Sequence, residues 1–433
     1  MKRIVILGGG TGGTMMANRL ARIYRRELRD GSVGITVVDQ NNHHVYQPAL
    51  LFLPFADYRP EQIVRPRRPQ LAKGVCFLQG DIDRVEPDAD VVFLKSGAAV
   101  PYDVLVIASG TRLAPEETEG MLGDGWRTRV FDFYTLPGAQ ALREALAKFA
   151  GGRLVINITE MPIKCPVAPL EFAFLADAYF TRRGIRDRVE ITFVTPLDKA
   201  FTKETCAAKL GHLLGDKNIR LVTEFATGQV DGAAGRLVSW DDRTVDFDLL
   251  VTIPLHLGQD FIGRSDGLGD SLNFVPTDPH TLQAKRKANI FALGDATDLP
   301  SSKAGSVAHF QAEVLAPNVR RFLAGQPLDP GFDGHANCFI ETGFGKALLI
   351  DFNYEVEPLP GRFPTPLGPL PLLRESRVNH LAKLAFQWVY WNLLLPGHDI
   401  PGIAPQMTMT GKEPLPLLAE IPPRAGAAAP THV

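Results

Sequence analysis

The chain has 433 residues, a formal net charge of −2 and 45% hydrophobic residues. A chain of this length exceeds one ordinary core and predicts two or three domains. The near-neutral charge and ordinary composition give no reason to expect a nucleic-acid partner. No stretch reaches the ~20 uninterrupted apolar residues that span a bilayer, and the N-terminal run 1–7 predicts a buried strand rather than a signal peptide.

The four cysteines, Cys76, Cys165, Cys206 and Cys338, are few and lie far apart in the sequence. They have neither the density of a disulfide scaffold nor the CxxC spacing typical of a metal site, so we expect no metal. In a reducing compartment, a pair among them is more often catalytic than structural.

The chain opens with a strand, a glycine-rich turn and a helix. Gly8, Gly10 and Gly13 supply the spacing G-x-G-x-x-G between an apolar strand and the helical run 14–23. These glycines permit a tight turn and bring the backbone close to a pyrophosphate at the helix N-terminus. The next strand, 34–39, ends in Asp39, an acid placed to accept hydrogen bonds from a ribose. The combination predicts a dinucleotide-binding unit.

Two later segments indicate which dinucleotide binds. The apolar strand in 103–111 ends in Ser109 and Gly110, and the strand in 288–296 ends in Gly294 and Asp295. In this order and spacing they resemble the segments of two-dinucleotide flavoproteins that contact FAD. A helix expected from about residue 304 to 322 would direct its positive N-terminal dipole at the flavin. We therefore expect FAD, with these four residues among its ligands.

The predicted fold class is α/β, with two Rossmann-like, three-layer domains of the type found in FAD/NAD-linked reductases. We expect a discontinuous FAD-binding domain from residues 1–112 and 250–330, with a second Rossmann-like domain, 113–249, inserted in it. Strands of the second domain are predicted at 153–157, 189–194 and, near its end, 249–253. The remaining tail, 331–433, contains a helical run at 374–395.

The segment 158–171, ITEMPIKCPVAPLE, follows the first strand of the second domain where a second glycine loop would be expected. It contains no glycine, and Pro162 and Pro166 have no N–H to donate to a pyrophosphate. We therefore expect this domain not to bind NADH. Cys165 would lie where the nicotinamide would otherwise approach the flavin.

The stretch KCPVAPLE, 164–171, together with HANCFIETG, 335–343, resembles sulfide:quinone oxidoreductase, and the resemblance covers nearly the whole chain. It implies that Cys165 and Cys338 form a redox disulfide or longer sulfur bridge beside the flavin. Sulfide attacks this bridge and is oxidised to polysulfide or zero-valent sulfur, and FAD passes the electrons to ubiquinone or menaquinone. The resemblance also assigns the contact with the flavin to Cys338.

Other residues match the same family by position. Glu171 matches a glutamate suggested to move protons near the sulfur site, although a solvated carboxylate in the first turn of a helix explains it equally well. Phe339, Lys383 and Phe386 resemble residues of the quinone pocket. Many family members carry a third cysteine that attaches the flavin, but residues 125–133 contain none, so we expect non-covalent FAD. Cys76 is expected to be buried, and Cys206 to be a small residue on a helix.

The helical run in the tail combines a basic and an apolar aromatic face. The basic set is Arg374, Arg377, His380 and Lys383, and the apolar set is Leu381, Leu384, Trp388 and Trp391. Such a helix is typical of a protein that lies on a bilayer, so we expect a peripheral protein of the inner (cell) membrane. The alternative is packing on its own domain or on a homo-oligomer partner. If the tail only serves the membrane, its removal from residue 374 onward should spare reduction of the flavin.

Two other activities remain open. A type II NADH:quinone dehydrogenase would show glycines near 158–166 and would not need the cysteine pair. A flavocytochrome c-type sulfide dehydrogenase shares the cysteines but passes electrons to a haem subunit and would need an export signal.

Overall fold

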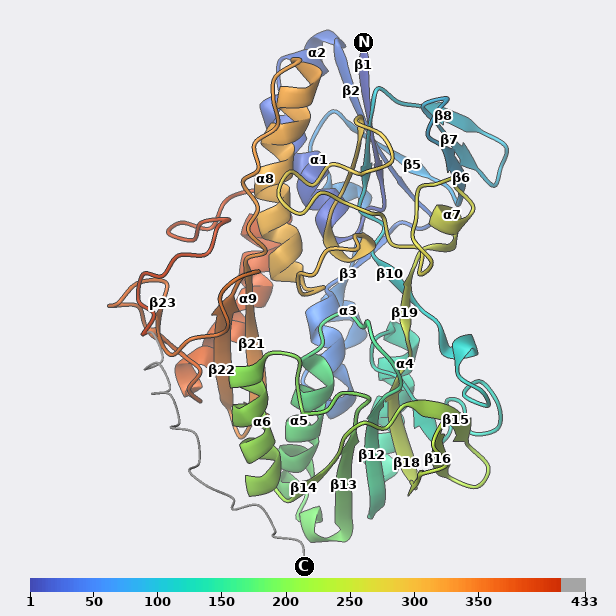
Figure 1. The fold of residues 1–433 in the computed structure, drawn as a ribbon, viewed down its shortest axis with the longest axis vertical. Helices are drawn as coiled ribbons and strands as arrows, with labels where there is room; N and C mark the ends of the chain where they lie inside the picture. The colour runs from blue at the N-terminus through green and yellow to red at the C-terminus, as the bar shows by residue number, and fades with distance from the viewer. Residues whose placement is uncertain (414–433) are drawn as a thin grey trace, which may run out of the picture.

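The computed structural model describes residues 1–413 and contains two five-stranded sheets, stacked end to end in Figure 1. Every pairing in both sheets is parallel. The first has the order β20 (Ile290–Ala292), β9 (Val104–Ile107), β1 (Lys2–Leu7), β2 (Val33–Asp39) and β5 (Val75–Gln79). The second has the order β11 (Val130–Phe131), β18 (Leu249–Ile253), β12 (Gly152–Ile158), β13 (Val189–Val194) and β14 (Ile219–Val222). The predicted α/β class is confirmed.

Helices cover both sheets. α1 (Thr11–Ile23) packs on the first sheet beside α8 (Gly305–Leu323), as expected for the helix at 304–322. On the second sheet, α5 (Ala168–Arg182) contacts β12 and β13, α6 (Glu204–Asp216) contacts β14, and α4 (Leu136–Lys148) contacts β11. The short helices are α2 (Glu27–Asp30), α3 (Pro60–Ile63) and α7 (Asp260–Gly263).

Smaller antiparallel elements flank the two sheets. They are β3 (His43–Val45) with β4 (Val64–Pro66); β6 (Ile82–Glu86), β7 (Val91–Leu94) and β8 (Ala99–Pro101); β15 (Thr227–Asp231), β16 (Arg236–Ser239) and β17 (Thr244–Asp246); and β23 (Gly361–Phe363) with β24 (Leu370–Leu372).

The two sheets are joined by a two-stranded antiparallel connection, β10 (Thr111–Leu113) and β19 (His256–Gly258). The chain leaves the first sheet through β10 and returns through β19, which makes the first half discontinuous. β18 pairs with β12 up to Ile253. A domain boundary at 249/250 would divide this strand, so the boundary must be corrected to a position after Ile253.

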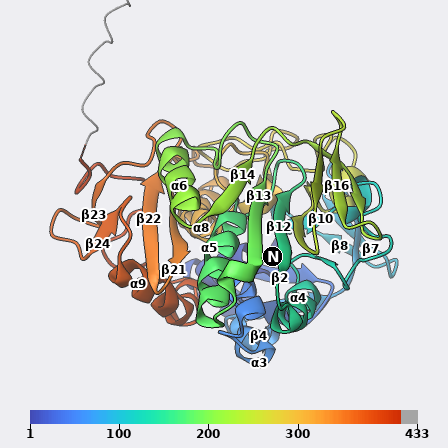
Figure 2. The same cartoon turned by 90° about the horizontal axis from the view of Figure 1, so that it is seen from below.

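The C-terminal region packs beside α5 as a long hairpin, β21 (Ala336–Gly343) and β22 (Lys346–Phe352), with α9 (Arg377–Val389) lying against β22 (Figure 2). α9 begins at Arg377, later than the expected start at residue 374, because the Ser376 side chain caps it by accepting a hydrogen bond from the Asn379 N–H. A π-helical turn, Tyr390–Leu394, follows directly.

This π-helical turn is part of the core of the FAD half. Tyr390 and Trp391 are only 2% and 5% exposed. The amide of Asn18 in α1 donates to the carbonyl of Leu395 at 2.7 Å, and Arg22 donates to the carbonyl of Gly397 at 3.0 Å. The expectation that the tail can be removed without affecting the flavin site is therefore wrong, because the cut would expose the face of α1.

Candidate active site

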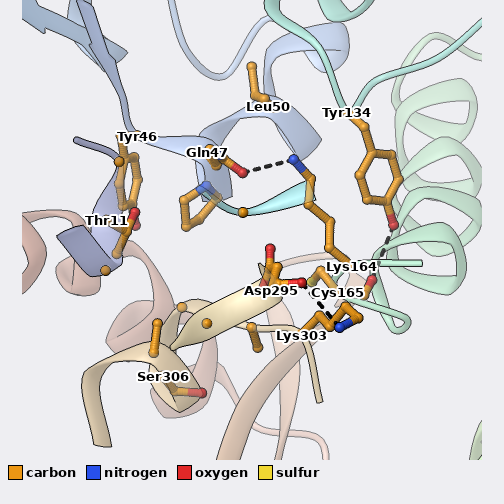
Figure 3. A pocket seen from close by; sticks show the side chains of 18 of the residues that line it. Thr11, Tyr46, Gln47, Leu50, Tyr134, Lys164, Cys165, Asp295, Lys303 and Ser306 are labelled. Atoms are coloured by element: carbon orange, nitrogen blue, oxygen red, sulfur yellow. Dashed lines mark hydrogen bonds between the residues drawn. The ribbon is translucent and has the colours of Figure 1, made fainter. Parts of the chain in front are cut away.

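A pocket of about 420 Å³ lies where the two sheets and the C-terminal region meet (Figure 3). Except for Gly13, every site residue expected from the sequence borders it. Those that border it are Gly8, Gly10, Asp39, Ser109, Gly110, Cys165, Glu171, Gly294, Asp295, Cys338, Phe339, Lys383 and Phe386. The fold thus collects residues from both sheets and the tail around one cavity.

The glycine loop has the shape that a pyrophosphate site needs. A Cβ on Gly13 would lie 1.8 Å from the carbonyl oxygen of Gly8, so this glycine lets α1 pack against the loop instead of lining the pocket. Gly8 has a φ of +94°, a conformation that other residues rarely adopt. A Cβ on Gly10 would meet nothing within 4 Å, so the backbone there faces open space at the start of α1.

Two hydroxyl groups in the pocket wall are available to hydrogen-bond a ligand. Within residues 1–413, the hydroxyls of Ser109 and Thr111 are buried without a hydrogen-bond partner, and both residues line the pocket. Buried polar groups are nearly always paired, so these two fit a polar ligand. Asp39 accepts a hydrogen bond from the Gly9 N–H at 2.7 Å and an ion pair from Arg67 at 3.0 Å.

The N-terminus of α8 also opens on the pocket. Ala304, Gly305 and Ser306 line it, and the Ala304 cap makes no side-chain hydrogen bond. The free N–H groups and dipole of this 19-residue helix favour negative charge there. Open glycine backbone, unpaired hydroxyls and a helix N-terminus fit the pyrophosphate, ribityl and ring of FAD.

Cys165 lies on a tightly held loop before α5. Its φ is +47°, and its N–H donates to the carbonyl of Lys303 at 2.7 Å. Its carbonyl accepts from the hydroxyl of Tyr134 at 3.1 Å, drawn as a dashed line in Figure 3. A left-handed conformation costs a non-glycine residue roughly 1–2 kcal/mol and persists only where neighbours enforce it. These contacts fix the position of the thiol at the pocket.

Cys338 reaches the same pocket from β21, and both cysteines are partly exposed to it as free thiols. The low-dielectric surroundings raise the pKa of the Cys338 thiol to about 12, with a further contribution from Glu171 and an opposing one from Lys383. Burial raises the pKa of Cys165 as well, and the charge of Glu171 adds to this. The site therefore favours neutral sulfur, as a thiol or a disulfide, over a free thiolate.

Glu171 was expected to be either a proton-handling residue or a solvated carboxylate, and the second interpretation is wrong. It is 2% exposed, accepts a hydrogen bond from the Glu341 N–H at 2.7 Å and forms an ion pair with Lys383. Burial raises the pKa of the Glu171 carboxyl, and Lys383 opposes this shift. Lys383 also donates to the carbonyl of Phe339 at 3.1 Å. The expected proton-handling and quinone-contacting residues therefore touch one another.

Three side chains outside the pocket can be compared with their expected positions. Cys76 is exposed at the edge strand β5, where its side chain points outward, so the expectation that it is buried is wrong. Cys206 lies on a helix, α6, as expected, and is buried there. Trp391, expected on the exposed apolar face of the tail helix, instead packs under the guanidinium of Arg65, whose Cζ lies 4.0 Å from its ring centroid.

The fold and the pocket define an FAD-dependent oxidoreductase with two Rossmann-like domains. Residues 2–160 match the family model of pyridine nucleotide-disulphide oxidoreductases. Over nine-tenths of its length the chain is similar to mitochondrial sulfide:quinone oxidoreductases. It is 26% identical to that of Mus musculus, covering 91% of this chain and 86% of the relative. It is 27% identical to that of Schizosaccharomyces pombe, covering 90% and 89%.

Among solved structures, the sulfide:quinone oxidoreductase of Aquifex aeolicus has the same fold, with a TM-score of 0.77 at 21% identity over 92% of each chain. The resemblance expected from the cysteine motifs, and with it FAD as cofactor, is confirmed.

Sequence reasoning missed several residues of the site. Arg67, Tyr134 and Lys303 hold Asp39 and the Cys165 loop from distant segments, and no local pattern marks them. Glu341 did carry a signal, because it follows the apolar run Cys338–Ile340 in a strand, where a buried carboxylate needs a partner. That partner is His380, which was expected on the basic face of the tail helix.

Proposed function

We propose that the protein oxidises sulfide at Cys165 and Cys338 and passes the electrons to a membrane quinone. The observation that carries this proposal is that two cysteines, 173 positions apart in the sequence, border the same pocket as the phosphate loop of the FAD half. The loop between β12 and α5, residues 159–167, supports the choice of reductant, because it contains two prolines and no glycine and so lacks the glycine loop that holds a nicotinamide pyrophosphate.

The chemistry of the pair is disulfide exchange. Hydrosulfide attacks one sulfur of a Cys165–Cys338 disulfide, forming a persulfide on that cysteine and releasing the other as a thiolate. When bound, FAD supplies a two-electron carrier between the cysteines and the quinone. The balanced result is that hydrosulfide, one proton and a quinone give zero-valent sulfur and a quinol. The charge of Lys383 opposes the rise that burial causes in the pKa of both thiols, and so stabilises the thiolate that this step releases.

We place the quinone at the end of the pocket bordered by Phe339, Lys383 and Phe386. Two aromatic rings there offer a flat apolar contact for a quinone ring, and Lys383 offers a charged donor for one of its oxygens. Phe339 belongs to β21, and Lys383 and Phe386 belong to α9. Because α9 borders this end of the pocket, we propose that a quinone with a long isoprenoid chain enters beside its outer face.

We further propose that α9 lies on the inner (cell) membrane. Its outer face presents a stripe of apolar side chains, whereas Asn379, His380 and Lys383 point inward to buried partners. The stripe is Val378 (46% exposed), Leu381 (61%), Leu384 (38%) and Trp388 (62%). Within residues 1–413 no helix has the length and apolarity to cross a bilayer. Attachment at the surface is therefore the membrane contact that we propose.

The decisive experiment is an anaerobic titration of the purified flavoprotein, following the visible absorbance of bound flavin. Sulfide should bleach the flavin, and NADH should not. Cys165→Ser and Cys338→Ser should each abolish bleaching by sulfide while FAD remains bound, whereas Cys76→Ser, an exposed cysteine outside the pocket, should behave as the wild type. Bleaching by NADH with sulfide inert would favour the type II NADH:quinone dehydrogenase instead.

Vesicle flotation tests the membrane contact. Leu381→Glu and Trp388→Glu should each reduce recovery of the protein with liposomes and slow the reduction of long-chain quinone more than that of a short, soluble analogue. Trp240→Glu is the matched control, because Trp240 is 79% exposed but lies on the turn after β16, far from α9 in sequence and fold. Equal flotation of all three variants and the wild type would contradict the proposed surface.

A further inference from the structure

We propose that Glu341 and His380 carry the proton that quinone reduction consumes from solvent into the pocket. This inference rests on the proposed function, since it concerns the proton balance of the same reaction. Neither residue borders the pocket. Both are joined through hydrogen bonds and charge to Glu171 and Lys383, which do.

The inner part of the route is a buried ion cluster. Glu171 and Glu341 are 2% and 1% exposed, and the N–H of Glu341 donates to the carboxylate of Glu171 at 2.7 Å. Lys383 forms an ion pair with Glu171 and lies within the field of both carboxylates, which raise the pKa of its ammonium against the effect of burial. A single ammonium group therefore serves two buried carboxylates.

The outer part of the route is His380, one turn before Lys383 on the inward face of α9. Its Nδ1 lies 3.0 Å from each carboxylate oxygen of Glu341, and its side chain is 23% exposed. Asp57, in the loop after the 3-10 turn Leu53–Phe55, also interacts with His380 through its charge. His380 thus touches solvent on one side and the buried carboxylate on the other.

The charges of the cluster require a movable proton. With Lys383 protonated, two carboxylates carry one negative charge too many, and an uncompensated buried charge costs several kcal/mol. The cluster becomes neutral only when one further proton resides on His380, Glu341 or Glu171. Because these three groups lie in sequence from solvent to pocket, that proton can be held at either end of the route.

The overall reaction of hydrosulfide with a quinone consumes such a proton. Hydrosulfide and a quinone require one proton from outside to yield zero-valent sulfur and a quinol. In the proposed route Glu171 or Lys383 gives a proton to the quinone oxygen, the cluster becomes negative, and His380 takes a proton from water and passes it to Glu341. The side chain of Lys383 can turn from one carboxylate to the other. This movement would carry the proton from Glu341 to Glu171.

The experiment separates the two half-reactions in the holoenzyme. Flavin is reduced anaerobically with sulfide, or with dithionite in a parallel arm, and then mixed with a short soluble quinone in a stopped-flow instrument with a pH-indicator dye. In His380→Gln and Glu341→Gln, sulfide should reduce the flavin at the wild-type rate, whereas reoxidation by quinone and proton uptake should both slow about 10-fold or more. The loss should grow as pH rises and shrink when imidazole is added to His380→Ala.

His43→Gln is the matched control, because His43 is an exposed histidine on β3 that does not border the pocket. It should match the wild type in both half-reactions. Wild-type rates of reoxidation in both His380→Gln and Glu341→Gln, or a loss that neither pH nor imidazole changes, would overturn the route alone. Dithionite-reduced wild type that no quinone reoxidises would overturn the proposed function and the route together. Bleaching by dithionite but not by sulfide would overturn only the assignment of the sulfur site.

Discussion

Replacing Lys383 by methionine tests whether the Glu171–Lys383 pair is a buried ion pair. The substitution keeps the length of the side chain but removes its charge. Within residues 1–413 it leaves Glu171, 2% exposed, with the Glu341 N–H as its one remaining donor. Lys383 itself is 12% exposed, so solvent screens the pair weakly. Removing one partner of such a pair destabilises a fold by about 3–5 kcal/mol. We expect a loss of this size near pH 8.

The loss should depend on pH in a defined direction. Burial already raises the pKa of Glu171 above the usual 4.5, and removing Lys383 removes the charge that opposes this shift. The folded variant then binds more protons than its unfolded chain, so its free energy of unfolding falls as pH rises from about 4.5 through the raised folded pKa. The destabilisation should be small near pH 5 and complete near pH 8.

The assay is urea unfolding of the holoprotein, followed by tryptophan fluorescence at several pH values. Lys209→Met, on the exposed face of α6, is the control and should change the free energy by no more than about 0.5 kcal/mol. The double variant Glu171→Gln/Lys383→Met should recover at least half of the loss, because glutamine still accepts from the Glu341 N–H without a charge. A loss that is equal at both pH values, or not recovered in the double variant, would refute the buried ion pair.

Three further outcomes follow from packing and exposure. Gly13→Ala should prevent FAD retention, measured by the flavin absorbance after gel filtration, because its Cβ would lie 1.8 Å from the Gly8 carbonyl oxygen. Trp391→Ala should lower the free energy of unfolding by about 3–5 kcal/mol in urea, since the ring is buried, and a change below about 1 kcal/mol would contradict its place in the core. At neutral pH, iodoacetamide should modify the exposed Cys76 much faster than Cys338, whose thiol has a pKa of about 12, and peptide mass mapping would reveal the reverse order if the site stabilised a thiolate.

The sequence alone determined the elements whose local pattern has one structural solution. Strands expected at 189–194 and 249–253 coincide with β13 and β18, because short runs rich in β-branched and apolar residues between turn signals are typical of a buried parallel strand. Gly8, Gly10 and Gly13 predicted the phosphate loop: the conformation of Gly8 and the close contact at Gly13 exclude larger residues, and Gly10 leaves the backbone open at the start of α1. The two cysteine motifs predicted the resemblance to sulfide:quinone oxidoreductase.

The tertiary structure decided what depends on distant partners. Helical spacing placed Trp388 and Trp391 on one apolar face, but only the fold shows that the first is exposed and the second lies under Arg65. The sequence left open whether Glu171 is solvated. The fold decides this, because α9 brings Lys383 into an ion pair with Glu171. Local sequence sets which side chains share a face and which turns are possible. It does not set what covers that face, because burial and charge pairing depend on segments hundreds of residues away, and these two effects determine the ionisation and exposure of the site.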